Sequence, residues 1–210
     1  MRTVTKEYTV YRYEELSEEA KERAKQDYLD DDIRPLFFTD NCNEDLANLF
    51  GCKAKLAVQY SLCYCQGDGL NIYGHVSAED IFNCLEKDNG GAQLAEFKNQ
   101  MTEKEKKTIL FYASVCGDVE LPYNRHYCYC IADQIDIAEG WAWELENSLI
   151  RDISNETLQK FEKLVRGIFS KLCKDYEEDG YNFFYEIDDE EMEEIGESNG
   201  WEFLEDGRIA

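Results

Sequence analysis

The excess of acidic residues constrains this chain more than any other feature of its sequence. Forty-six aspartates and glutamates stand against 22 lysines and arginines, which gives a net charge of −24 at pH 7. Such a charge destabilises a compact state by self-repulsion, so the acids must lie at the surface of a substantial core. Hydrophobic residues make up 43% of the chain and aromatic residues 13%. This composition is sufficient for a core and argues against global disorder.

The acidic residues are concentrated toward the C-terminus. Residues 1–120 carry a net charge of −9, and residues 121–210 carry −15. Between Asp175 and Asp206 there are 15 acids and no base. A length of 210 residues without a Pro/Gly/Ser-rich linker favours one α+β domain over residues 1–210, with a more acidic part after residue 120.

The charge also limits the classes of partner. It repels nucleic acid and anionic membranes, so we expect neither direct nucleic-acid binding nor membrane binding, and it attracts basic protein surfaces. Solubility alone is the alternative role for the charge. No signal peptide and no apolar run of about 20 residues is found. Nine cysteines are an odd number, which indicates reduced thiols in a cytoplasm.

Alternating and helical patterns predict the secondary structure. Alternation favours a hairpin of strands 54–65 and 70–76, closed by Gln66-Gly67-Asp68-Gly69. A small antiparallel sheet with hairpins packed against several helices is therefore expected, with an acidic C-terminal helix and a terminal hairpin over 201–209. Further strands are predicted at 3–13 and 125–132. Helices are predicted from Ser17 to about residue 29, at 44–50, 78–87, 103–116, 138–151, 155–178 and 189–198.

Side chains that cap helices support these boundaries. Ser17 and Ser154 precede helical patterns, and Gly51 follows one. Two pairs have the spacing of a capping box, in which a hydroxyl and a carboxyl satisfy each other's backbone N–H groups. These pairs are Ser77 with Asp80 and Thr102 with Glu105.

The acidic residues of the last predicted helix form rows. Glu190 and Glu194 are four residues apart, so they lie about 6 Å from each other on a helix surface. This distance is comparable with the separation of neighbouring phosphates on a nucleic-acid strand. Rows of this kind predict a surface that imitates a nucleic acid, although a solvated acidic face is the alternative. The predicted partner-binding residues are Asp188, Asp189, Glu190, Glu191, Glu193, Glu194, Glu197, Trp201, Glu202, Glu205 and Asp206.

Cysteines in two predicted strands raise the question of a metal site or an enzyme. Cys63 with Cys65, and Cys128 with Cys130, would each point to one face of a strand. Four thiolates could bind zinc, but structural zinc usually uses C-x₂-C turns, and buried cysteine is common in cores. No catalytic motif occurs. We therefore expect no enzyme, no catalytic residue, no metal and no cofactor.

Three segments resemble a known group of proteins. They are YRYEELSEEAKERA at residues 11–24, SLCYCQGDG at 61–69 and NGWEFLEDGRI at 199–209. Together they resemble small acidic accessory proteins of phages and prophages in Gram-positive bacteria. Some acidic phage proteins of this size are anti-CRISPR or antirestriction factors, which block a host nuclease, often as DNA mimics. None of the segments is a catalytic motif.

The resemblance implies a phage origin and an anti-defence role in the cytoplasm of a bacterial host. The first hypothesis is therefore an anti-CRISPR nuclease inhibitor, whose partner is an RNA-guided CRISPR nuclease or its guide-loaded complex. A second is a non-catalytic phage interaction or regulatory module that binds another basic protein. A third is a cysteine- or zinc-dependent enzyme built on Cys63, Cys65, Cys128 and Cys130.

Overall fold

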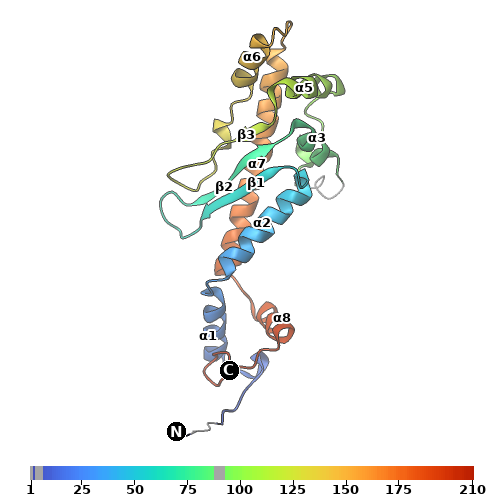
Figure 1. Cartoon of the computed structure of the whole chain (residues 1–210). Helices are drawn as coiled ribbons and strands as arrows, with labels where there is room; N and C mark the ends of the chain where they lie inside the picture. Colours follow the sequence, from blue (N-terminus) through green and yellow to red (C-terminus); the bar gives the residue numbers. More distant parts are fainter. Residues whose placement is uncertain (1, 3–6, 88–92) are drawn as a thin grey trace. The chain divides into compact units, whose positions relative to one another are not determined.

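The computed structural model describes residue 2, residues 7–87 and residues 93–210 (Figure 1). Contacts within the chain group it into two units, which we call the terminal unit, Met1–Phe38 with Gly180–Ala210, and the central unit, Thr39–Asp179. Helices α2 (Arg34–Phe50) and α7 (Asn155–Tyr185) contribute residues to both. These units do not coincide with the predicted parts 1–120 and 121–210, and the single-domain assignment stays a prediction.

The sheet belongs to the central unit. In the part of the chain that the structure describes, it has three strands in the order β1 (Lys55–Ser61), β2 (Gly69–Val76) and β3 (Val119–Leu121). Both pairings are antiparallel. The predicted hairpin is confirmed, while β3 was not predicted because three residues are too few to show an alternating pattern. Together with the helices, this sheet confirms the α+β class.

Helix α7 supplies much of the core of the central unit. Its side chains at Phe161, Phe169 and Cys173 are almost fully buried. The ring of Phe169 stacks on Phe50 of α2 at 5.3 Å between centroids. Phe161 contacts Phe82 of α3 (Ala78–Glu86) and Trp141 of α6 (Ala138–Asn147). A helix with this many large apolar contacts holds the surrounding elements together through buried surface.

Where a side chain caps the first turn of a helix, the structure confirms the predicted first residue of that helix. The Thr102 hydroxyl accepts from the Glu105 N–H, and the Glu105 carboxylate accepts from the Thr102 N–H at 2.6 Å. Helix α5 (Glu103–Cys116) accordingly has the predicted bounds. Helix α2 is longer than predicted, because Pro35 lies in its first turn, where a missing N–H costs nothing. Within residues 7–87 and 93–210, the structure also has the short 3-10 helices η1 (Tyr13–Glu15), η2 (Ala95–Phe97) and η3 (Ala132–Gln134). Between the helices predicted at 78–87 and 103–116 the sequence also predicts a loop over 88–91, and these residues lie outside the described part of the chain.

The strand predicted at 125–132 is wrong. The backbone there bonds to side chains instead of to a neighbouring strand. The Gln59 amide donates to the Asn124 carbonyl at 2.9 Å and accepts from its N–H at 3.1 Å. The Asn124 side chain in turn accepts from the N–H groups of His126 and Tyr127. Side-chain bonds of this kind compete with a strand ladder and produce an irregular segment.

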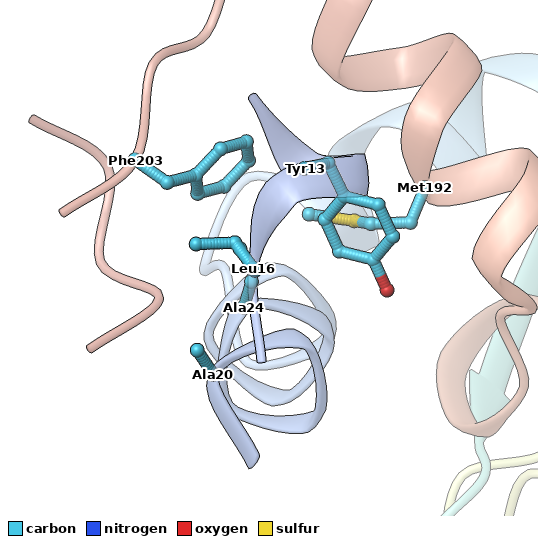
Figure 2. Close-up of a cluster of buried hydrophobic side chains, with 6 residues drawn as sticks. All are labelled: Tyr13, Leu16, Ala20, Ala24, Met192 and Phe203. Carbon is cyan, nitrogen blue, oxygen red and sulfur yellow. The ribbon is translucent and has the colours of Figure 1, made fainter. Parts of the chain in front are cut away.

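The terminal unit has its own core. Helix α1 (Glu18–Leu29), helix α8 (Asp189–Asn199) and η1 surround one apolar cluster (Figure 2). In Figure 2 the ring of Phe203 and the side chain of Met192 lie against Tyr13 and Leu16. Ala20 and Ala24 are four residues apart on one face of α1, where their small side chains permit close approach, and Leu16 packs beside them from the segment that precedes the helix. The cluster comprises Tyr13, Leu16, Ala20, Ala24, Met192 and Phe203.

The two ends of the chain meet through backbone bonds. The Tyr11 and Phe203 backbones exchange N–H···O bonds of 2.9 and 2.8 Å. This single bridge replaces the strand predicted at 3–13, which is wrong for residues 7–12, whereas residues 3–6 lie outside the described part. The predicted terminal hairpin is present as a tight turn, in which Phe203 pairs with Ile209 and Gly207 adopts a φ of 87°.

Candidate protein-binding surface

Helix α8 begins and ends at residues that are suited to those positions. The Asp188 carboxylate caps it by accepting from the Glu191 N–H at 2.8 Å. Three acids in the first turn face the positive end of the helix dipole, which favours them. Gly200 ends the helix in a left-handed conformation, with a φ of 66°. Met192 and Gly196 are buried against the cluster of the terminal unit, Asp189, Glu193 and Ile195 are half-buried, and the other positions of the helix are exposed.

Most of the exposed positions of α8 are acidic. Glu190 and Glu194 are one helical turn apart, so roughly 5–6 Å separates their Cβ atoms. We use the term α8 acidic surface for the exposed acids of α8 and its flanking residues. They are Asp188, Glu190, Glu191, Glu194, Glu197, Glu202 and Glu205.

Two of the predicted partner-binding acids already have partners within the terminal unit. Asp189 accepts a hydrogen bond of 2.9 Å from the Lys25 ammonium and one of 3.0 Å from the Tyr13 hydroxyl. These bonds hold the pKa of Asp189 below its usual value. Asp206 pairs with Arg208 at 2.9 Å and with Arg23 at 3.6 Å. Both acids therefore contribute less free negative charge than sequence reasoning assigned to them.

A cleft of about 450 Å³ opens beside this surface within the terminal unit. We call it the α8 cleft. Its wall combines four carboxylates with aromatic side chains, among them the half-buried Trp201, whose ring packs on Tyr28 at 6.1 Å. The acids are Glu14, Glu193, Glu197 and Glu202, and the aromatic residues are Tyr13, Trp201 and Phe203.

Two carboxyl groups meet in the wall of the α8 cleft. A hydrogen bond between Glu193 and Glu14 raises the pKa of Glu193, and the nearby charges of Glu14 and Glu197 act in the same direction. Carboxylates in contact repel each other unless a proton or a cation lies between them. The cleft therefore has the electrostatic character of a site for a positively charged group, and the half-buried ring of Trp201 can contact such a group by cation–π attraction.

Sequence reasoning missed the N-terminal side of the α8 cleft. Arg12, Tyr13 and Glu14 line it, although they lie far from α8 in the sequence. In the sequence, Arg12 and Tyr13 end the strand predicted at 3–13, and their segment resembles other proteins, but neither feature indicates a cleft. The apolar spacing of Tyr13, Leu16 and Ala20 could have placed η1 against a core, but it does not indicate which helix supplies that core.

The four cysteines of the third hypothesis do not lie in strands. Cys63 and Cys65 follow β1 in the hairpin loop, and Cys128 and Cys130 lie in the irregular segment. The two segments are neighbours, because the Cys128 N–H donates to the Gly67 carbonyl at 3.1 Å. Among residues 7–87 and 93–210, no group of three or more histidine, cysteine, aspartate or glutamate side chains is arranged to hold a metal ion.

The hairpin loop is organised by one carboxylate. Asp68 accepts from the N–H groups of Cys63 and Cys65 at 2.6 and 2.8 Å and from the Ser61 hydroxyl at 2.7 Å. The Cys65 thiol also donates to it at 3.0 Å. These bonds hold the pKa of Asp68 well below its usual range. The predicted turn is thus confirmed, with positive φ at Gly67 and Gly69, and Asp68 acts as its internal acceptor.

No helix in the described part of the chain is both long enough and apolar enough to cross a membrane. Comparison of the chain with protein-family models, with curated proteins and with solved structures gives no match.

Proposed function

We propose that this chain is a phage anti-defence protein, an anti-CRISPR, which binds and inhibits an RNA-guided DNA nuclease in the cytoplasm of a bacterial host. The observation that carries the proposal is the α8 acidic surface beside the α8 cleft. The resemblance of three segments to acidic phage proteins supports the phage origin. The net charge of −24 supports a basic protein as the partner, because such a charge repels nucleic acid itself.

The spacing of the carboxylates supports an imitation of nucleic acid. A nuclease groove presents lysines and arginines at intervals that match phosphates on a strand. Glu190 and Glu194 present two negative side chains on one face of a folded helix, with roughly 5–6 Å between their Cβ atoms, so the backbone is already ordered before the groove closes on them. On binding, the lysines and arginines of the nuclease would release their bound counterions and pair with these carboxylates. Association should therefore be fast at low salt and slow as salt rises.

The α8 cleft supports an anchoring contact within that interface. A lysine or arginine of the nuclease that entered the cleft would lie beside Glu193 and Glu14, whose mutual repulsion it would relieve. The ring of Trp201 offers an apolar and cation–π contact for the same side chain. Aromatic residues next to charge-paired sites are frequent energetic centres of protein interfaces.

The decisive assay measures DNA cleavage by a guide-loaded RNA-guided nuclease with and without this protein. A gel shift of the same nuclease on its target DNA is run in parallel. Loss of both cleavage and DNA binding is expected, because an acidic mimic occupies the groove that DNA would enter. Loss of cleavage with DNA binding retained would contradict occupation of the groove. Unchanged cleavage across a panel of such nucleases would overturn the anti-CRISPR proposal and favour a non-inhibitory interaction module.

A charge-matched pair of variants locates the surface. The test variant combines Glu190→Gln, Glu193→Gln, Glu194→Gln and Glu197→Gln. The control removes four charges from exposed acids of the central unit, through Asp118→Asn, Glu120→Gln, Glu139→Gln and Glu146→Gln.

The two variants separate a specific surface from bulk charge. We expect the test variant to lose about 100-fold or more in inhibitory potency, since several charge pairs each contribute to the complex. The control should inhibit almost as well as wild type. Equal loss in both variants would assign inhibition to net charge alone. Full inhibition by a folded test variant would exclude α8 as the binding surface.

A further inference from the structure

Another cavity, of about 550 Å³, lies within the central unit and is lined by α5 and by the loop that joins α6 to α7. Helices α5 and α6 contact each other and lie side by side (Figure 1). We call this cavity the α5 groove. Most of the side chains that line it are exposed, so it is an open surface feature rather than an enclosed pocket. Its basic and apolar wall is formed by Lys104, Lys107, Phe111, Tyr112, Ile150 and Arg151.

The α5 groove brings together three cations that have no ion pair. Lys104 and Lys107 lie on α5, and Arg151 comes from the loop. In the part of the chain that the structure describes, no carboxylate lies within ion-pair distance of any of the three. By contrast, Lys106 of the same helix pairs at 3.0 Å with Glu103, which also lines the groove. In a chain with a net charge of −24, this wall is complementary to an acidic ligand.

An aromatic ring continues the same face of α5. Lys104, Lys107 and Phe111 follow one another at intervals of three and four residues, which places them on one side of the helix. The Phe111 ring is 52% exposed, and its centroid lies 5.9 Å from that of the buried Tyr112. The groove thus offers an apolar contact next to its cations, a combination that is frequent at protein-binding surfaces.

The loop that carries Arg151 ends α6 with a strained residue. The Leu149 N–H donates to the Glu146 carbonyl at 3.1 Å and the Ile150 N–H to the Leu145 carbonyl at 3.0 Å, which is the bonding pattern of a Schellman motif. This motif usually has glycine at its left-handed position, whereas Leu149 has a φ of 59° and is 86% exposed. Glycine would end the helix there without strain. A leucine held in solvent at this position indicates that its side chain contacts a partner.

The other end of the loop is bonded to α5. The Ser154 N–H donates to the Tyr112 hydroxyl at 2.9 Å. Asp152, which also lines the groove, has a φ of 62° and adds one negative charge beside the three unpaired cations. Arg151 and Leu149 are therefore presented from a backbone that is fixed at both ends, so less conformational entropy is lost when a ligand binds.

We propose that the α5 groove binds an acidic peptide segment of a partner protein, in which a large apolar side chain lies next to carboxylates. The carboxylates pair with Lys104, Lys107 and Arg151, and the apolar side chain lies against Phe111 and Leu149. A nucleic-acid strand fits less well, because its continuous negative charge meets the net charge of −24. A second copy of the chain meets the same repulsion over its whole surface.

This site extends the range of partners beyond the proposed function. The α8 acidic surface requires a basic partner, whereas the α5 groove requires an acidic one. The two sites lie in different units of the chain, and neither proposal depends on the other. Failure of nuclease inhibition would leave the α5 groove unaffected, and failure of peptide binding would leave the α8 acidic surface unaffected.

A nuclear magnetic resonance titration locates the binding site. The full chain, isotope-labelled, is titrated with a short peptide in which glutamates alternate with phenylalanine and leucine. The amide signals of Lys107, Phe111 and Arg151 should shift to saturation at millimolar peptide. The same peptide with serine in place of its apolar residues should bind about fivefold more weakly or worse. Unchanged signals at these three residues would overturn the proposal.

A charge-matched pair of variants tests the cations. The test variant combines Lys104→Gln, Lys107→Gln and Arg151→Gln. The control removes three positive charges from exposed lysines of the central unit that do not line the groove, through Lys53→Gln, Lys55→Gln and Lys174→Gln.

The two variants separate the groove from bulk charge. The test variant should lose about tenfold or more in peptide affinity, since each ionic contact contributes to binding. The control should remain within about twofold of wild type, because its changes lie outside the groove. Equal loss in both variants would assign binding to the total charge and overturn the proposal.

Leu149→Gly separates a binding role from a structural one. Glycine relieves the left-handed strain at the end of α6, so the unfolding midpoint should rise. Peptide affinity should fall at the same time, because the exposed apolar contact is lost. Phe111→Ala should lower the affinity as well. Wild-type affinity in both folded variants would overturn the apolar part of the proposal.

Two further measurements identify other occupants. A single-stranded oligonucleotide that shifts the amides of the α5 groove more strongly than the acidic peptide would replace the peptide with a nucleic acid. Shifts of the same amides on concentration of the protein alone would assign the groove to a second copy of the chain. Either result would overturn the proposal, which expects neither.

Discussion

The Tyr13 hydroxyl donates a hydrogen bond of 3.0 Å to the Asp189 carboxylate, and the two residues are 176 positions apart in the sequence. This bond links the N-terminal 3-10 helix to the first turn of α8. Lys25 of α1 donates to the same oxygen at 2.9 Å. The three side chains tie both ends of the chain into one unit and fix the orientation of the helix that carries the α8 acidic surface.

Removal of this bond should cost less than removal of the apolar contact next to it. Tyr13→Phe keeps the ring in the core and loses one hydrogen bond, so we expect a loss of about 1 kcal/mol in the free energy of unfolding. Met192→Ala removes a fully buried side chain and should cost about 2–5 kcal/mol. Urea unfolding, followed by amide exchange in α1 and α8, measures both. If Tyr13→Phe lowered the free energy of unfolding more than Met192→Ala, the result would contradict the view that apolar contacts stabilise the terminal unit.

Two glycines of the terminal unit should respond differently to alanine. Both have positive φ, 66° at Gly200 and 87° at Gly207. A side chain at Gly200 would meet open space, so the left-handed backbone alone should cost about 1–2 kcal/mol. A side chain at Gly207 would collide with the Ala20 carbonyl of α1. Gly207→Ala should therefore lower the unfolding midpoint clearly more than Gly200→Ala, and equal midpoints would contradict this close approach.

The contact between Glu14 and Glu193 should make the terminal unit more stable in mild acid. Because the pKa of Glu193 is raised above its ordinary value of 4.5, the folded state binds this proton more tightly than the unfolded chain. This proton therefore stabilises the folded state at pH values below the ordinary pKa of Glu193. That stabilisation is lost as pH rises through the raised pKa of the folded state. Glu193→Gln removes the charge that repels Glu14, so this variant should unfold less readily than the wild type at pH 7.

The control for this pH effect is Glu194→Gln, which removes the same charge from an exposed position next to it. Unfolding midpoints of the two variants and the wild type are compared at pH 7 and pH 4. The advantage of Glu193→Gln should be largest at pH 7. Identical midpoints for both variants at both pH values would exclude a specific contact with Glu14.

Asp68 should control the order of the hairpin loop. Asp68→Asn replaces one of the two accepting carboxylate oxygens with an NH₂ donor. The N–H groups of Cys63 and Cys65 then compete with other donors for the single amide oxygen that is left. We expect faster amide exchange at both cysteines, with Asp118→Asn as the exposed control. The pKa of Asp68 is lower in the folded state than its ordinary value of 3.8. The contribution of Asp68 to the free energy of unfolding is therefore present above pH 3.8 and is lost only as pH falls below that value. Unchanged exchange in Asp68→Asn would contradict this role.

The sequence alone predicted the features that depend on neighbouring residues. The capping pair Thr102 and Glu105 located the start of α5, and Ser17 located that of α1, because a cap is satisfied within one helical turn. The β1–β2 hairpin followed from alternation on both sides of a glycine-rich turn. The strand predicted at 125–132 failed because Gln59 and Asn124 supply its backbone bonds, and a side-chain partner of that kind leaves no periodic pattern.

The tertiary structure decided which distant residues meet. The sequence determined that a helix forms at about residues 189–198 and that this helix is acidic. It did not determine that Tyr13 and Lys25 bind Asp189, or that Glu14 meets Glu193. Local patterns fix helices and turns because their bonds close within a few residues. Contacts between distant residues form only when burial of a shared core offsets the entropy of closing the chain between them.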